Sequence, residues 1–166
     1  MVVEIRQMNA ICVLGWVDRL HIAVWRGSGV DESHMFYREM KAGIARFGSG
    51  VGHLAVIEPG TPLPPPEARK TIARVFNEHP GAVSAVSVAS EGQGFFASAV
   101  RSVATGLMML ARTPVPFRLS GSVVDSAAFL SKHIVSPDGA PHDGRVYVHA
   151  VLEMRRKLHQ QLPRSA

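Results

Sequence analysis

The chain has 166 residues, of which 46% are hydrophobic and 19% are charged, and its formal net charge is +5 at pH 7. This length and composition are typical of one globular domain with a single hydrophobic core, which excludes global disorder. The basic residues are scattered, and the cluster Arg155-Arg156-Lys157 is typical of a solvated helix end. We therefore expect no nucleic-acid partner, because binding to a phosphate backbone needs a basic stripe.

Secretion and membrane insertion are not predicted either. The single cysteine, Cys12, lies in an apolar stretch, where a thiol usually packs as a small hydrophobe, and it cannot form an intramolecular disulfide. The N-terminus carries Glu4 among its apolar residues and has no signal-peptide cleavage site. The longest apolar stretch, residues 95–111, contains polar residues and is shorter than the ~20 residues that span a bilayer. We expect a cytoplasmic protein without a membrane span.

The N-terminal part of the chain is predicted to form a hairpin and a helix. Strands are predicted around residues 11–14 and 20–25, the second because apolar residues alternate there at the period of a half-buried strand. A helix is predicted over residues 31–47, with one apolar face at helical spacing, and Gly48 is predicted to stop it.

Three strand–helix pairs are predicted to follow. The strands are expected at 54–57, 82–89 and 115–119, and the helices after them at 66–76, 95–111 and 123–133. The first of these strands is apolar on both faces, which predicts a central parallel strand. The helix at 95–111 is the most apolar, and we expect most of its surface to be covered. This order predicts an α/β fold with a mixed, mainly parallel sheet, opened by an antiparallel hairpin and connected by crossover helices.

A Pro- and Gly-rich segment at residues 136–141 is predicted to be a linker. We therefore divide the chain into a domain at 1–135 and a linker plus C-terminal amphipathic helix at 136–166. The apolar stripe of that helix comprises Tyr147, Val151, Met154, Leu158 and Leu162. We expect this segment to lie outside the domain core, with its stripe packed on the body or on a second subunit, so that a chain without it still folds.

The segment Gly92-Gln93-Gly94-Phe95-Phe96-Ala97 is a G-x-G-x-x-A pattern between a predicted strand and a predicted helix. Such glycines let backbone N–H groups approach an anion at a helix N-terminus. The bulky residues Phe95 and Phe96 at the spacer positions, and the lack of an acid after the next strand, count against dinucleotide binding. Two alternatives are left: a site for a small anionic or polar ligand, and a tight turn without a ligand. Successive helical positions diverge by about 100°. We therefore expect one phenylalanine in the core and the other facing the loop at 58–61.

Glu58 and Glu91 each follow a predicted parallel strand, at the edge where α/β proteins bind ligands. If the two strands are adjacent, the loops that begin at these acids lie together at that edge. Paired acids there can transfer protons, and solvated strand-end acids are the alternative. The eight histidines lack the spacing that brings two imidazoles to one metal, so no metal or cofactor is expected. His53 starts a buried strand and is predicted to be a hydrogen-bonded edge histidine rather than a metal ligand. A Ser/His/Asp triad stays open, because its members need not be adjacent in sequence.

With this element order, residues 9–133 resemble the SpoIIAA-like fold of STAS domains and of bacterial STAS/SEC14-type proteins. The resemblance rests on Val24-Trp25-Arg26-Gly27, on Val56-Ile57-Glu58-Pro59-Gly60, and on Glu91-Gly92-Gln93-Gly94-Phe95 before an Ala/Val-rich helix. In STAS anti-anti-sigma factors, the loop after the corresponding strand carries an Asp-Ser-Ser/Thr-Gly signature whose hydroxyl is phosphorylated. Here the loop reads Glu58-Pro59-Gly60-Thr61, so the phosphorylation switch is not carried over. The SEC14-type resemblance implies a lipid or another apolar ligand.

We therefore predict a non-catalytic STAS-like signalling module that binds a protein partner, with a second copy of the chain as one candidate. The predicted binding residues are Glu58, Gly60, Thr61, Glu91, Gly92, Gln93, Gly94, Phe95 and Phe96. One alternative is a carrier of a small molecule or lipid, which a cavity lined by the helix at 95–111 would favour. The other is a small enzyme that uses Glu58 or Glu91, which an enclosed pocket containing both acids would favour.

Overall fold

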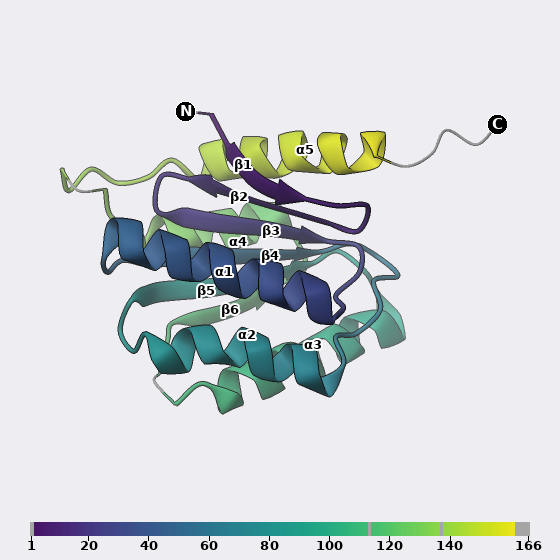
Figure 1. The fold of residues 1–166 in the computed structure, drawn as a ribbon. Coiled ribbons are helices and arrows are strands. Elements are labelled where there is room, and N and C mark those ends of the chain that lie inside the picture. The colour runs from purple at the N-terminus through teal and green to yellow at the C-terminus, as the bar shows by residue number, and fades with distance from the viewer. Residues whose placement is uncertain (1, 113, 137, 162–166) are drawn as a thin grey trace.

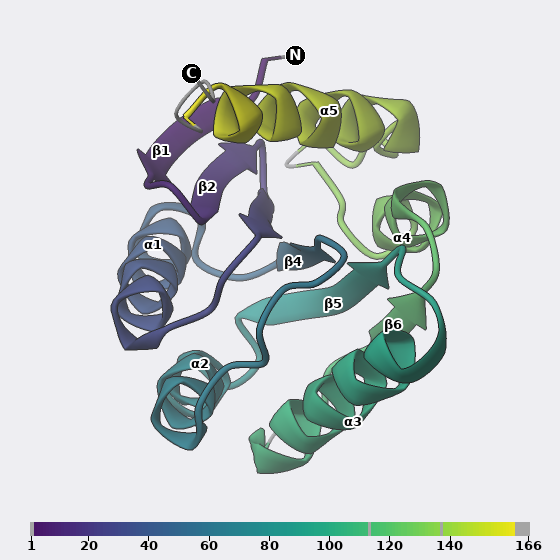
Figure 2. The same cartoon turned by 90° about the vertical axis from the view of Figure 1, so that its right-hand side faces the viewer.

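In the computed structural model, which describes residues 2–112, 114–136 and 138–161, a six-stranded sheet lies between two layers of helices (Figures 1 and 2). The strands are β1 (Glu4–Met8), β2 (Cys12–Val17), β3 (Leu20–Trp25), β4 (Val51–Ile57), β5 (Val83–Ser90) and β6 (Phe117–Ser120). The helices are α1 (Val30–Phe47), α2 (Pro66–Glu78), α3 (Gly94–Leu110), α4 (Val123–Ser131) and α5 (Gly144–Gln160).

The strands lie side by side in the order of the chain. β1, β2 and β3 pair antiparallel, and β3, β4, β5 and β6 pair parallel. The predicted α/β class, with a mixed sheet that an antiparallel hairpin opens, is confirmed, and β4 lies inside the sheet as its apolar sequence predicts. The edge strand β1 is missing from the predicted elements, because its charged residues Glu4 and Arg6 leave little apolar periodicity.

The helices divide between the two faces of the sheet (Figure 2). α1, α2 and α3 connect successive parallel strands and all run over one face, as crossovers of a single hand do when each strand is added beside the last. α4 and α5 follow the final strand and cover the opposite face, so the central strands are buried on both sides.

β3 illustrates the consequence of this double coverage. Leu20, Ile22 and Val24 belong to the core cluster beneath α4 and α5, whereas Ala23 and Trp25 belong to the cluster beneath α1, α2 and α3. Each residue of the strand is buried. The expectation of a half-buried strand is therefore wrong, because alternation in the sequence does not reveal a second helical layer.

α5 is part of the hydrophobic core. The side chains of Tyr147, Val151, Met154 and Leu158 are fully buried and share a cluster with residues of β2, β3 and α4. The predicted apolar stripe thus packs on the body, whereas the expectation that the chain beyond residue 136 lies outside the core is wrong. Without α5, the face of the hairpin opposite α1 would be bare. Leu162, the last predicted member of the stripe, lies outside the described residues.

α3 is less covered than its composition predicts. Only Val100 and Ala104 are fully buried in this helix, whereas Phe95 and Met109 are 89% and 81% exposed. The expectation that most of its surface is covered is wrong. The reason is geometric: the sheet ends at β6, a strand of four residues, which offers little surface to a helix of 17 residues.

We predict that replacing Leu158 by alanine lowers the free energy of unfolding by about 2–5 kcal/mol, the usual cost of a cavity at a buried leucine. The matched control is Leu152→Ala on the same helix, since Leu152 is 55% exposed. We expect the control to change stability by less than about 0.5 kcal/mol. Urea unfolding of both variants measures the difference, and equal costs would contradict the place of α5 in the core.

Candidate functional site

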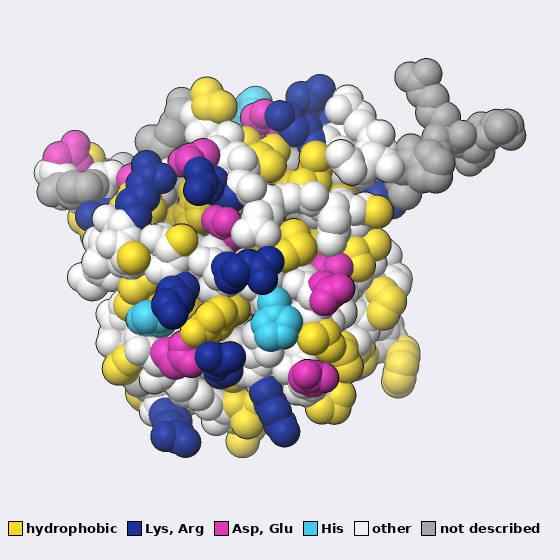
Figure 3. Space-filling view, in the orientation of Figure 1, with side chains coloured by type: hydrophobic (Ala, Val, Ile, Leu, Met, Phe, Trp, Pro, Cys, Tyr) yellow, Lys and Arg dark blue, Asp and Glu magenta, His cyan; other side chains and the backbone are white. Residues whose placement is uncertain are grey.

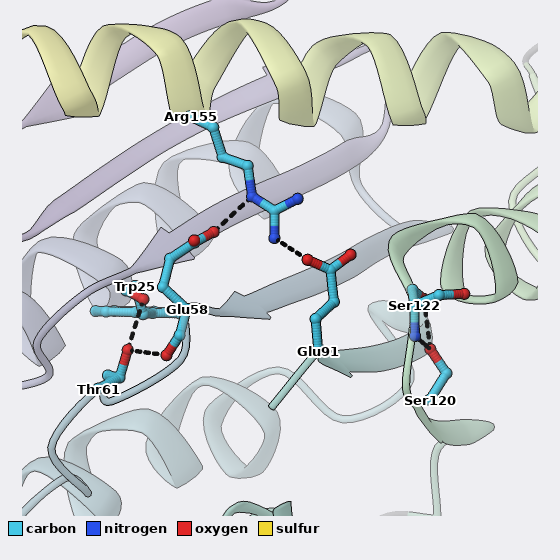
Figure 4. A network of polar contacts seen from close by, with 7 residues as sticks. All are labelled: Trp25, Glu58, Thr61, Glu91, Ser120, Ser122 and Arg155. Carbon is cyan, nitrogen blue, oxygen red and sulfur yellow. Dashed lines mark hydrogen bonds and ion pairs between the residues drawn. The ribbon is translucent and has the colours of Figure 1, made fainter. Parts of the chain in front are cut away.

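The two predicted loops meet at the carboxyl edge of the sheet, where one arginine joins them (Figure 4). Glu58 follows β4 and Glu91 follows β5. Arg155 reaches down from α5, with its Nε 2.5 Å from Glu58 Oε1 and its Nη2 2.7 Å from Glu91 Oε2. The expectation that neighbouring parallel strands bring these loops together agrees with this geometry.

Arg155 lies in a more buried environment than the sequence predicts. Its side chain is only 18% exposed, so the interpretation of the cluster at 155–157 as a solvated helix end is wrong for this residue. Burial alone would lower the pKa of its guanidinium, but hydrogen bonds to Glu58 and Glu91 raise it. One available signal was its position beside Met154, on the border of the apolar stripe.

This pairing gives the two acids a structural role. Each carboxylate accepts a charge-assisted hydrogen bond from a guanidinium that stays protonated at every relevant pH. The arrangement fixes the exits of β4 and β5 to α5.

Thr61 secures the loop that follows β4. The Thr61 N–H donates to the Glu58 carbonyl over 3.1 Å, and Gly60 has a φ of +79°. Proline at the second position and a left-handed glycine at the third are typical of a type II turn. The buried Thr61 hydroxyl lies 2.6 Å from the Glu58 carbonyl oxygen and 3.0 Å from that of Trp25. It therefore ties the turn to the end of β3.

The glycine-rich loop before α3 positions two phenylalanines differently. The ring of Phe96 lies over Gly92, where an added Cβ would be 2.2 Å from the ring, and it packs against the core beneath α1, α2 and α3. Phe95 is 89% exposed. One ring thus faces inward as predicted. That the other ring faces the loop at 58–61 stays a prediction, because its exposure alone does not fix its direction.

A cavity of about 110 Å³ lies between α3 and the sheet. Its floor includes Ala55 of β4 and Val88 of β5, and one wall is formed by Val103, Leu107 and Met108 of α3. The three α3 side chains are only partly buried. The remaining walls come from α2 and from the proline-containing loop at 61–64. Of the residues predicted from the sequence to form a binding site, only Thr61 lines this cavity.

Apart from the indole N–H of Trp25, three polar side chains interrupt the otherwise apolar lining among the described residues. Two of these, Ser28 and Thr61, already donate their hydroxyl protons to backbone carbonyls, Ser28 to Pro62 over 2.9 Å. The third is His53, whose Nδ1 lies 3.1 Å from Nδ1 of His21 on the neighbouring strand. Neither Glu58 nor Glu91 lines this space.

The two histidines form a buried pair in register on β3 and β4. Burial, and then the proximity of His53, holds the pKa of His21 well below its ordinary value. Burial lowers the pKa of His53 to about 4. Both imidazoles are therefore neutral at pH 7. The structure agrees with the interpretation of His53 as a hydrogen-bonded histidine, although it lies inside the sheet.

A serine, a histidine and an aspartate do meet elsewhere in the structure. His142 Nε2 lies 2.9 Å from Ser136 Oγ and 3.2 Å from Asp18 Oδ2. A catalytic triad uses the two ring nitrogens for the two partners, whereas here one nitrogen contacts both. The cluster therefore lacks the triad geometry, and it attaches the segment before α5 to the turn between β2 and β3.

The surface over α1 and α2 carries charges of both signs. Figure 3 shows Lys and Arg side chains interspersed with Asp and Glu side chains on this face. Within residues 2–112, 114–136 and 138–161, no group of three or more His, Cys, Asp or Glu side chains is arranged to hold a metal ion. None of the helices described is both long and apolar enough to cross a membrane.

Comparison with known proteins gives no relative. No protein-family model matches the chain, and neither a curated protein nor a solved structure matches it.

We predict that Arg155→Met destabilises the protein by about 1–3 kcal/mol, because it leaves two carboxylates without their shared donor. Arg156→Met is the matched control, since Arg156 is the adjacent and exposed arginine of α5. We expect that control to lie within about 0.5 kcal/mol of the parent. A double-mutant cycle with Glu58→Gln, followed by urea unfolding, measures the coupling. A coupling energy of zero would contradict the structural role of this ion pair.

We predict that acid destabilises the protein through the histidine pair. Above about pH 6.5 both histidines are neutral in the folded and unfolded chains, so their contribution to stability is fully present. Below that pH the unfolded chain binds protons first. The free energy of unfolding then falls by up to ~1.4 kcal/mol per pH unit for each histidine, until the pH reaches the folded pKa, about 4 for His53.

Urea unfolding between pH 7.5 and 5 tests this in the parent, in a His21→Leu/His53→Leu variant and in His159→Gln, whose histidine is exposed. The double variant should show a shallower pH dependence, and His159→Gln should retain the parental one. Identical slopes in all three proteins would show that the pair does not titrate as described.

Proposed function

We propose that the protein is a non-catalytic binding protein for a small apolar molecule, which it holds in the cavity between α3 and the sheet. The observation that carries this proposal is the incomplete burial of Val103, Leu107 and Met108, which line the cavity from α3. A cavity lined by this helix is the feature that favours a carrier over a purely protein-binding module. We now place the carrier first.

The side chains around the cavity are incompletely packed. Protein interiors are normally filled to the density of organic crystals, and an apolar void gives up the contacts that its lining would make. A ligand that completes the burial of these side chains would gain about 0.8 kcal/mol for each CH₂ group removed from water. A dry engineered cavity of ~150 Å³ accommodates benzene, so a space of this order suits one ring or a short branched chain.

The chemistry of the surroundings supports binding without catalysis. Glu58 and Glu91 are engaged by Arg155 and lie outside the cavity lining. Cys12 is fully buried, and burial raises the pKa of its thiol far above the ordinary value. A cysteine nucleophile needs a lowered pKa, whereas the pKa of Cys12 is raised. We therefore regard an enzyme that uses either acid as the weaker alternative.

The resemblance to STAS and SEC14-type proteins is compatible with this proposal. An antiparallel hairpin followed by parallel strand–helix units is the element order on which the resemblance rests, and the SEC14-type resemblance implies an apolar ligand. We propose that the chain is a SpoIIAA-like member of this kind. Its loop at 58–61 would then serve the cavity, since Thr61 lines it, in place of a phosphorylation switch.

Protein binding remains a second candidate function, because α3 also exposes apolar side chains on its outer side. Phe95 and Met109 lie 14 positions apart, and therefore about 40° apart around the helix axis. Antiparallel pairing of two α3 helices would bring Phe95 of one copy to Met109 of the other, an isologous contact between two copies of the chain.

Sedimentation velocity tests this second candidate. We predict that the parent protein self-associates and that a Phe95→Ser/Met109→Ser variant is monomeric at the same concentration. Val124→Ser, an equally polar change at an exposed residue of α4, is the control and should associate like the parent. A parent protein that stays monomeric at all concentrations would contradict self-association through α3.

We predict that toluene binds saturably to the parent protein and shifts NMR signals of residues that line the cavity. Ala104→Met should fill the space from within and weaken toluene binding at least tenfold. Thr105→Met adds a similar side chain at an exposed position of the same helix and should bind toluene like the parent. Circular dichroism verifies that both variants are folded.

Two results would overturn the proposed function. The first is a parent protein that shows no saturable binding of toluene. The second is equal binding by the parent and a folded Ala104→Met variant, which would place the ligand elsewhere. Native mass spectrometry of the purified protein complements the titration, because a retained apolar ligand would identify the natural occupant by its mass.

A further inference from the structure

We propose that His53 is the specificity-determining residue of the cavity, where its Nε2–H donates a hydrogen bond to an uncharged acceptor oxygen on the ligand. The ligand class is then an apolar molecule that carries one carbonyl or ether oxygen. This inference rests on the proposed function and deepens it, because it adds a polar recognition element to an apolar site.

His53 is held rigidly at the cavity. It lies on β4, is only 6% exposed and lines the space beside Phe36, whose ring centroid is 4.8 Å from that of the imidazole. Its Nδ1 faces Nδ1 of His21 over 3.1 Å. Since one ring nitrogen is engaged in this contact, Nε2 is the nitrogen that His53 can offer to a ligand.

The proton positions follow from the burial of His21. A neutral imidazole carries one proton, and one of the two facing Nδ1 atoms must donate while the other accepts. His21 is fully buried, and its Nε2 has no hydrogen-bond partner among the described residues. If His53 donated, the His21 proton would sit on that Nε2 as a buried N–H without an acceptor.

The alternative tautomer moves the unpartnered N–H from the fully buried His21 to His53, the member of the pair that lines the cavity. If His21 donates from Nδ1, its Nε2 carries only a lone pair, and a buried acceptor without a partner is more readily tolerated than a buried N–H. His53 then accepts at Nδ1 and carries its own proton on Nε2. His21 therefore acts as a positioning residue, because it fixes the tautomer in which His53 is a donor toward the cavity.

The surroundings also restrict the charge of the ligand. Among the residues that the structure describes, no Lys or Arg side chain lines the cavity, and burial keeps the imidazole of His53 neutral near pH 7. An anion would have to leave water for an apolar space without a cation to pair with, which is strongly unfavourable. The hydroxyl protons of Ser28 and Thr61 are already donated to carbonyls. The geometry therefore favours a neutral oxygen opposite His53.

Two probes of matched shape test the proposal. Acetophenone and α-methylstyrene differ only in a carbonyl oxygen in place of a terminal CH₂ group. We expect the parent protein to bind acetophenone about 3–10 times more tightly, the advantage of one neutral hydrogen bond in a buried site. In a folded His53→Phe variant we expect the two affinities to agree within a factor of two. His34→Phe, at a partly exposed histidine of α1, is the control and should keep the parental preference.

The outcomes separate this inference from the proposed function. If both probes bind the parent with equal affinity in the cavity, the role of His53 is wrong and the apolar binding site stands. If neither probe binds the parent protein, this inference fails, and the binding of toluene decides the proposed function separately. A preference for acetophenone that persists in the His53→Phe variant would assign the recognition to another group and would also overturn the inference.

The tautomers provide a test that needs neither a variant nor a ligand. Nitrogen-15 chemical shifts and long-range proton–nitrogen couplings distinguish a protonated Nδ1 from a protonated Nε2 in each imidazole. We expect the proton of His21 on Nδ1 and that of His53 on Nε2 at pH 7. The reverse assignment would leave His53 without a donor toward the cavity and would overturn the proposal.

Discussion

Coverage of the sheet by helices on both faces is the constraint on which the rest of this structure depends. It removes water from β3 and β4, so the polar side chains of the central strands must find partners within the protein. Ser87 and Ser126 satisfy this requirement with a hydrogen bond of 2.7 Å between their hydroxyls. His21 and His53 satisfy it only in part, because Nε2 of His21 is left without a partner among the described residues. The tautomers of the two imidazoles follow from this missing partner at Nε2 of His21.

α3 shows what happens where the coverage is incomplete. Its sequence is as apolar as a core helix, yet the sheet beneath it ends at a short strand and cannot bury it. The result is a space beneath the helix that is bounded mainly by apolar side chains and by His53, together with an outer helix face that exposes Phe95 and Met109. A cavity of this kind costs stability in the empty protein. A ligand that fills it recovers that cost, which links the packing of the fold to its proposed function.

α5 connects the opposite face of the sheet to the carboxyl edge. Its buried residues close the core over the hairpin, and Arg155 on the same helix binds the acids that end β4 and β5. The turn at 58–61 leads directly into the loop that lines the cavity. Because Arg155 holds Glu58 at the start of this turn, a shift of α5 would also move a wall of the cavity. The segment after residue 136, whose composition predicts a peripheral position, therefore contributes both to the core and to the loop beside the cavity.

The sequence by itself determined the class of the fold, the order of all elements except β1, and the meeting of the loops after β4 and β5. These features depend on local periodicity, on turn residues such as Gly48 and Gly60, and on the rule that parallel strands end at one edge. Only the tertiary structure decided which side chains act together. Gly43, for example, lies within α1 without a local reason, and the ring of Trp16 occupies the place where its Cβ would lie. Likewise the contacts of Arg155 with Glu58 and of His21 with His53 join residues 97 and 32 positions apart. No local pattern encodes such distances, because they depend on how the layers pack.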